Sequence, residues 1–182
     1  MKIAVTGHKS GIGKAIYTLL SQTHTVIGFD LDTINLEKQS DRNSIIEQIK
    51  DYDVFINNAF GNGSQMPMFT EILEQWKEDS SKLIINIGST MKFKRNMGSM
   101  TTDMALFPPH YINLKKELYN KTISSTFLDD TKCKVSIIQP GFTKTKFTEE
   151  LDFEQMEPEQ VAEQVKYIIE SDVHIVDITF TK

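Results

Sequence analysis

Short apolar runs rich in β-branched residues alternate with helical patterns along the sequence, and this alternation constrains the fold more than any other feature. Near-continuous apolar runs are typical of strands buried on both faces, as in a parallel sheet that helices cover. The pattern predicts an α/β protein with a doubly wound, mostly parallel sheet, helices on both faces and right-handed crossovers. The expected strands lie at 3–5, 25–29, 54–56, 83–87, 135–138 and 173–176, and the clearest helices at 14–20, 42–50 and 160–169.

Composition and charge exclude several classes of protein. The chain has 182 residues, with 20 Lys and Arg against 25 Asp and Glu, and its net charge of −5 makes it a poor candidate for binding nucleic acid. Its single cysteine, Cys133, cannot form an internal disulfide. The apolar stretches are too short for a membrane span, and no signal-peptide pattern precedes the first expected strand. We therefore expect one cytoplasmic domain over 1–182, with neither a membrane nor a nucleic acid as partner.

A glycine-rich turn follows the first expected strand and leads directly into a helical segment. Glycines at positions 7, 11 and 13 allow a sharp turn, close approach of the backbone to a pyrophosphate and tight packing of helix on strand. A P-loop does not fit, because His8 stands five residues before Gly13 and Lys14 is followed by alanine. A dinucleotide turn is favoured over an ordinary strand–helix turn. The candidate cofactor contacts here are Gly7, Lys9, Ser10, Gly11, Ile12 and Gly13.

An acidic residue follows the second expected strand. Asp30 lies 17 positions after Gly13, close to the spacing at which a carboxylate accepts hydrogen bonds from the adenine ribose of a dinucleotide. The same carboxylate repels a 2′-phosphate, which favours NAD over NADP. Lys9 in the glycine turn is a cation that could meet such a phosphate, so NADP is not excluded. Without the glycine turn, Asp30 would indicate only a solvated strand end.

Five motifs in order make the chain resemble the short-chain dehydrogenase/reductase family, as a shortened and divergent member with a Rossmann-like fold. They are Thr-Gly-x-x-x-Gly-x-Gly at 6–13, Asn-Asn-Ala at 57–59, a serine at 89, Tyr-x-x-x-Lys at 111–115 and Pro-Gly-x-x-x-Thr at 140–145. The second motif departs from the family, which continues with glycine where this chain has Phe60. Each motif alone is common, but the five together cover nearly the whole chain.

The resemblance implies a site for hydride transfer. Tyr111 and Lys115 are four residues apart and share one face of a helix, so the ammonium can lower the phenol pKa from its ordinary value of ~10. By resemblance, Tyr111 exchanges a proton with the substrate oxygen, Lys115 tunes Tyr111 and holds the nicotinamide ribose, and Ser89 hydrogen-bonds the same oxygen. The other implied cofactor contacts are Asp41, Asn58, Ala59, Pro140, Gly141, Thr143 and Thr145. No metal site is expected.

The predicted function is an NAD(P)(H)-dependent oxidoreductase that moves hydride between nicotinamide and a small-molecule alcohol or carbonyl substrate. Two alternatives keep the same fold: a non-catalytic dinucleotide-binding protein, such as a redox sensor, and a scaffold subunit. In those cases Tyr111 would be a packing residue and Ser89 a cap of a helix or turn. Family members often assemble through the helices after their fourth and fifth strands, so we expect a homodimer or homotetramer.

Three segments depart from the family pattern. Between the second and third motifs only 71–79 is expected to form a helix, and it lacks the asparagine that helps to hold a proton-relay water in the family. The gap from Ser89 to Tyr111 is 22 positions, and its methionine-rich part, 91–109, is expected to be a long loop that is either a lid or a surface insertion. The segment at 145–158 is short where the family carries substrate-binding helices, which predicts a shallow site or one completed by another segment.

Overall fold

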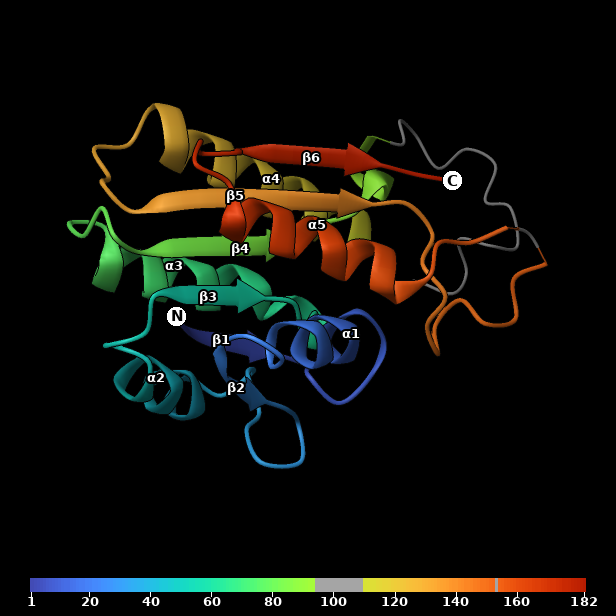
Figure 1. Cartoon of the computed structure of the whole chain (residues 1–182), viewed down its shortest axis with the longest axis horizontal. Helices are drawn as coiled ribbons and strands as arrows, with labels where there is room; N and C mark the ends of the chain where they lie inside the picture. The colour runs from blue at the N-terminus through green and yellow to red at the C-terminus, as the bar shows by residue number, and fades with distance from the viewer. Residues whose placement is uncertain (94–109, 153) are drawn as a thin grey trace.

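A parallel six-stranded sheet forms the centre of the fold in the computed structural model, which describes residues 1–93, 110–152 and 154–182. The strands stand in the order β2-β1-β3-β4-β5-β6, and every neighbouring pair is parallel (Figure 1). The strand order reverses at β1, which defines a doubly wound sheet and confirms the expected fold class. The strands are β1 Lys2–Thr6, β2 Thr25–Phe29, β3 Val54–Asn57, β4 Leu83–Ile87, β5 Lys134–Pro140 and β6 Asp177–Phe180.

Helices cover both faces of the sheet. One face carries α1 (Gly11–Leu20) and α5 (Pro158–Glu170), which pack against each other, and the opposite face carries α2 (Gln39–Gln48), α3 (Gln65–Trp76) and α4 (Tyr111–Phe127). Two short 3-10 turns, η1 (Gly61–Gly63) and η2 (Thr90–Phe93), follow β3 and β4. Because all strands are parallel, the segments that follow them meet at one edge of the sheet, its carboxyl edge. Within the described ranges, no helix has the length and apolar character needed to cross a membrane.

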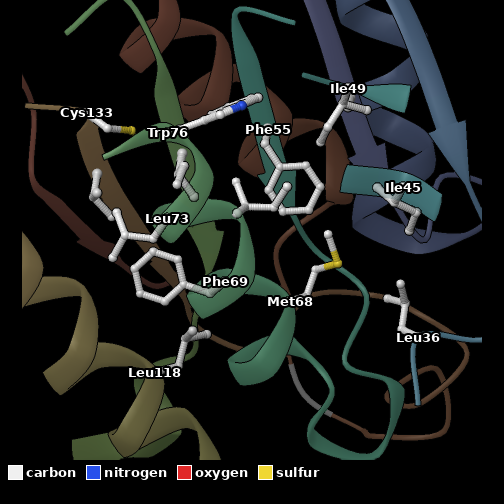
Figure 2. Close-up of a cluster of buried hydrophobic side chains, with 14 of the residues drawn as sticks. Leu36, Ile45, Ile49, Phe55, Met68, Phe69, Leu73, Trp76, Leu118 and Cys133 are labelled. Carbon is white, nitrogen blue, oxygen red and sulfur yellow. The ribbon is translucent and has the colours of Figure 1, made fainter. Parts of the chain in front are cut away.

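Two hydrophobic cores, one on each face, explain the apolar runs. In β1, Ile3 and Val5 belong to the core beneath α1 and α5, while Ala4 belongs to the core on the other face. Figure 2 shows this second core, where Phe55 of β3 packs among side chains of α2 and α3. The labelled helix residues there are Ile45, Met68, Phe69, Leu73, Trp76 and Leu118, and the labelled Ile49 directly follows α2. Central strands are thus dry on both faces, so neither face requires alternating polar residues.

The third helix begins earlier than expected. The sequence predicts a helix at 71–79, but α3 already begins at Gln65 and ends at Trp76. Pro67 lies in its first turn, where the N–H that proline lacks would have no helical partner. The segment between β3 and β4 therefore contains a full twelve-residue helix.

The final strand also lies later than expected. The apolar run at 173–176 precedes the strand, and β6 occupies Asp177–Phe180 at the edge of the sheet. Polar side chains alternate along β6, and Gln139 of β5 donates hydrogen bonds to Asp177 (2.8 Å) and Thr179 (3.1 Å). An edge strand of this kind has no continuous apolar run. Of the methionine-rich loop expected at 91–109, the first three residues belong to η2 and the rest lie outside the described residues.

Candidate active site

The glycine turn closes tightly between β1 and α1. Gly7 has a φ of +72°, in the left-handed region that favours glycine. A side chain at Gly13 would overlap the carbonyl oxygen of Gly7, so α1 can begin this close to β1 only with glycine at that position. Ser10 precedes α1 and its hydroxyl makes no capping hydrogen bond, while Ile12 packs against the core beneath α1. As in any helix, the first N–H groups of α1 have no acceptor within the helix, which suits an anion.

The loop after β3 is bonded to the glycine turn. Thr6 Oγ1 accepts hydrogen bonds from the backbone N–H groups of Asn58 (3.0 Å) and Ala59 (3.1 Å). Asn58 Nδ2 donates in turn to the carbonyl oxygen of Thr6 (2.9 Å). β1 and β3 are the strands between which the order reverses, and doubly wound sheets bind their ligands outside this point. The structure therefore brings the first two sequence motifs together where a ligand is expected.

A pocket of about 180 Å³ opens beside this junction. Its walls come from the glycine turn, the end of β2, the loop before α2 and the loop after β3. The lining residues are Gly7, Phe29, Asp30, Leu31, Ile34, Asn35, Leu36, Glu37, Ala59 and Gly61. A carboxylate and backbone groups at the edge of an otherwise largely apolar pocket suit a flat heterocycle with a polar sugar attached.

Carboxylates dominate the charge around this pocket. Asp30 accepts hydrogen bonds from the backbone N–H groups of Lys9 (2.9 Å) and Leu31 (2.8 Å). The Lys9 ammonium pairs with Asp32, and its hydrogen bond lowers the pKa of that carboxyl. Asp41 does not line the pocket; the N–H of Asn35 donates to it (2.8 Å), so Asp41 holds the loop that forms one wall.

The segment after β5 reaches back to the glycine turn. Pro140 is the last residue of β5 and Gly141 follows it at the carboxyl edge of the sheet. A Cβ placed on Gly11 would lie 3.1 Å from Thr145 Cγ2, so Thr145 lies directly over the turn. Thr143 is buried within the same segment. Between Thr145 and α5, the residues that the structure describes form no helix, which agrees with the short segment noted in the sequence.

Tyr111 begins α4 and meets Ser89, although the two residues are 22 positions apart in the sequence. A side-chain hydrogen bond joins them. Burial raises the pKa of the Tyr111 phenol, and the hydrogen bond with Ser89 partly offsets this effect because it stabilises the phenolate. A hydroxyl pair of this kind can hold a substrate oxygen between two hydrogen-bonding groups.

Lys115 lies one helical turn beyond Tyr111 and is buried. Its Nζ donates to the carbonyl oxygen of Ile87 (2.8 Å) and to Gln65 Oε1 (2.6 Å), and it lies 5.5 Å from the centre of the Tyr111 ring. Burial without a carboxylate partner lowers the pKa of Lys115 to about 7. The amine therefore changes its charge near neutral pH, close to a phenol.

Two residues at this site were not identified from the sequence. Phe60, which departs from the family pattern, packs its ring against Tyr111 with centroids 4.9 Å apart and lies 5.6 Å from Lys115 Nζ. Gln65, in the first turn of α3, bonds Lys115 directly. The position of Phe60 directly after the Asn-Asn-Ala motif could have indicated that it belongs to the site. Nothing in the sequence marks Gln65 as buried.

Other reactive side chains lie apart from this cluster. Cys133 is buried under α3, and burial raises the pKa of its thiol to about 12, so it is not a nucleophile. The His8 ring packs against Tyr17, with centroids 5.1 Å apart. Across the described part of the chain, no group of three or more His, Cys, Asp or Glu side chains could hold a metal ion.

Comparisons of sequence find no matching family model and no matching curated protein. Comparisons of structure find several similar solved structures. A 3-ketoacyl-(acyl-carrier-protein) reductase from Brucella melitensis complexed with NADH has a TM-score of 0.77 at 17% identity, over 99% of this chain and 96% of that chain. The closed form of a serine dehydrogenase complexed with NADP+ has a TM-score of 0.77 at 18% identity, over 100% and 94%. A short chain dehydrogenase/reductase family protein has a TM-score of 0.75 at 16% identity, over 100% and 95%. The chain therefore has the fold of the short-chain dehydrogenases/reductases.

Proposed function

We propose that this chain is an NAD(P)(H)-dependent oxidoreductase of the short-chain dehydrogenase/reductase type, acting on a small-molecule alcohol or carbonyl compound. The observation that carries the proposal is the hydrogen bond between Ser89 and Tyr111 beside the buried Lys115. Two hydroxyl groups and an amine with a pKa near neutrality are the groups that proton transfer to a carbonyl oxygen requires.

The residues around the carboxyl ends of β1 and β3, where the strand order reverses, fit a dinucleotide. Gly13 lies so close to the Gly7 carbonyl oxygen that no side chain fits there. A pyrophosphate can therefore approach the backbone N–H groups at the start of α1. The neighbouring pocket suits the adenosine, with Asp30 toward the ribose hydroxyls. Asn58, Ala59, Gly141 and the threonines of the 140–145 motif would face the remainder of the cofactor.

The carboxylates favour NAD over NADP. Asp30 would repel a 2′-phosphate, and Lys9, the cation that could attract one, is already paired with Asp32. Freeing Lys9 requires breaking only an exposed ion pair that solvent screens, so NADP binding is disfavoured and not forbidden.

When bound, the nicotinamide supplies or accepts the hydride. In carbonyl reduction, the Tyr111 hydroxyl donates its proton to the substrate oxygen as the carbon receives the hydride, and alcohol oxidation reverses both transfers. Ser89 donates a hydrogen bond to the same oxygen and orients it. The positive charge of protonated Lys115 stabilises the phenolate form of Tyr111, which lowers the barrier for giving up the proton.

Purified protein mixed with NADH or NADPH and a panel of ketones and aldehydes tests this function through loss of absorbance at the nicotinamide band. Tyr111→Phe removes the proton donor and should lower turnover by about 10²–10⁴-fold, the usual contribution of a positioned acid or base. Tyr167→Phe, on the exposed face of α5, is the matched control and should keep full turnover. Equal turnover in the two variants would refute the role of Tyr111.

A dinucleotide-binding protein without dehydrogenase chemistry is the second candidate. It is favoured by one observation: both acceptors of the Lys115 amine are groups of the protein itself, so Lys115 has a structural role in the absence of any ligand. This candidate predicts NADH binding that Tyr111→Phe leaves intact, with no turnover on any member of the panel.

Light scattering of the purified protein tests the expected homodimer or homotetramer.

A further inference from the structure

Hydrogen bonds hold the Gln65 side-chain amide in one orientation, because its nitrogen and oxygen cannot swap places without losing them. The side chain is buried, with 3% exposed, and its Nε2 donates to the carbonyl oxygens of Asn57 (2.8 Å) and Ile87 (3.0 Å). Carbonyl oxygens only accept hydrogen bonds, so a flipped amide would set Oε1 against two other acceptors. Oε1 therefore faces Lys115 Nζ, at 2.6 Å.

The three groups form a closed ring of hydrogen bonds. Lys115 Nζ donates to Gln65 Oε1 and to Ile87 O, and Ile87 O also accepts from Gln65 Nε2. With 4% of Lys115 exposed, the ring fixes the position of the amine at the end of β4. This buried ring is rigid, because rotating either the Lys115 or the Gln65 side chain would leave a buried polar group without its hydrogen-bond partner.

The backbone of Gln65 is fixed as well. Asn57 Nδ2 donates to the carbonyl oxygen of Gln65 (2.9 Å) and to Asn86 Oδ1 (2.9 Å), and Asn86 Nδ2 donates to Thr122 Oγ1 of α4 (2.9 Å). The ends of β3 and β4 are thereby connected to both α3 and α4, the two helices that carry Gln65 and Lys115.

The surroundings of Lys115 contain no compensating negative charge among its described contacts. α3 presents the neutral amide of Gln65, β4 presents the carbonyl of Ile87, and the loop after β3 presents the Phe60 ring. From α4 itself, the titratable group that faces the amine is Tyr111. Tyr111 is therefore the group whose ionisation is most strongly coupled to the charge of Lys115.

We propose that Gln65 is a positioning residue that holds Lys115 through a neutral acceptor, so that the charge of the amine is paired with the Tyr111 phenolate and not with a carboxylate. Its catalytic meaning rests on the function proposed above. A carboxylate at position 65 would keep Lys115 permanently charged and would withdraw that charge from Tyr111. An apolar side chain would leave the amine with one acceptor and without a fixed position.

Titration of Lys115 by NMR tests this without relying on activity. The protein is labelled with ¹³Cε-lysine, and the Lys115 signal is assigned by its loss in Lys115→Met. Gln65→Glu should raise the pKa of Lys115 by about 1–3 units, the effect of an opposite charge at this distance. At pH 8, a rise of one unit from a value of about 7 increases the protonated fraction about fivefold. Gln65→Met, of similar length and without an acceptor, should lower the pKa, because the charged form loses a hydrogen bond.

Gln48→Glu on the exposed face of α2 is the matched control and should leave the Lys115 titration unchanged. A Lys115 pKa that is the same in wild type, Gln65→Glu and Gln65→Met would overturn the proposal. The pH profile of kcat/KM should move in the direction of the measured pKa in both Gln65 variants. If the pKa moves as expected and the wild type turns over no carbonyl compound, the placement of Lys115 by Gln65 stands and the oxidoreductase function fails. If turnover is present and the pKa does not move, the function stands and the role of Gln65 fails.

Discussion

The burial of Lys115 makes the stability of the fold depend on pH, and Lys115→Met should remove that dependence. Burial lowers the pKa of this amine from 10.5 to about 7. Between these two values the unfolded chain keeps a proton that the folded chain has released, so raising the pH shifts the equilibrium toward the folded state. Each unit of pH within this range adds up to 1.36 kcal/mol, and integration from pH 7 to pH 9 gives a gain of about 2 kcal/mol. Below pH 7 both states are protonated and the contribution no longer changes.

Urea unfolding at pH 7 and pH 9 measures this gain. Methionine keeps the length of the side chain and leaves Gln65 Oε1 without a donor, but that loss has no pH dependence and cancels when the two pH values are compared. Lys116→Met, next to it on α4 and less buried, is the matched control. The free energy of unfolding should rise by about 2 kcal/mol more in wild type and Lys116→Met than in Lys115→Met. Equal changes in all three proteins would refute the reasoning.

Three further substitutions test the parts of the site separately. Gly13→Ala places a Cβ on the carbonyl oxygen of Gly7 and should weaken NADH binding in a calorimetric titration at least about tenfold; unchanged affinity would contradict a pyrophosphate at this turn. Asp30→Ser removes the carboxylate at the ribose end of the pocket and should shift the ratio of NADPH to NADH affinity toward NADPH by about tenfold, whereas a constant ratio would exclude Asp30 as the discriminating group. Arg42→Leu removes the bidentate ion pair with Glu71 (2.9 Å for both hydrogen bonds) that joins α2 to α3. The free energy of unfolding, measured by urea unfolding, should fall by about 2–4 kcal/mol, whereas a loss below about 0.5 kcal/mol would show that the pair is dispensable.

Most of the fold could be predicted because the four inner strands, β1, β3, β4 and β5, are buried along almost their whole length, and the edge strand β2 is also mostly apolar. Phe55 and its neighbours in β3 face dry cores on either side, and a run of apolar residues is the direct consequence. β6 was misplaced because polar residues alternate along it, unlike in the other edge strand, β2: its Asp177 and Thr179 accept hydrogen bonds from Gln139, and the apolar run lies just before the strand. The start of α3 was misplaced because Pro67 interrupts a helical pattern in most positions, and only in a first turn is it harmless.

The site is predictable to the extent that its motifs follow strands. Parallel strands bring their carboxyl ends to one edge, and the glycine turn and the Asn-Asn-Ala motif, which both follow strands, meet there. The approach of Ser89 to Tyr111 depends on how α4 packs on the sheet, which no local pattern encodes. Gln65 was not identified because burial and orientation of an amide arise from tertiary hydrogen bonds, and a glutamine in a first turn is ordinarily solvated.

Transfer of label from the cofactor is the most direct test of the proposed reaction. Wild-type protein is incubated with NADH carrying deuterium at the reactive position of the nicotinamide, together with the carbonyl panel, and the alcohols are analysed by mass spectrometry. We expect the proposed reaction to place deuterium at the carbinol carbon of at least one product from wild type, with at least about a hundredfold lower incorporation by Tyr111→Phe. NADH binding without any labelled alcohol from wild type, or equal incorporation by the two proteins, would contradict it.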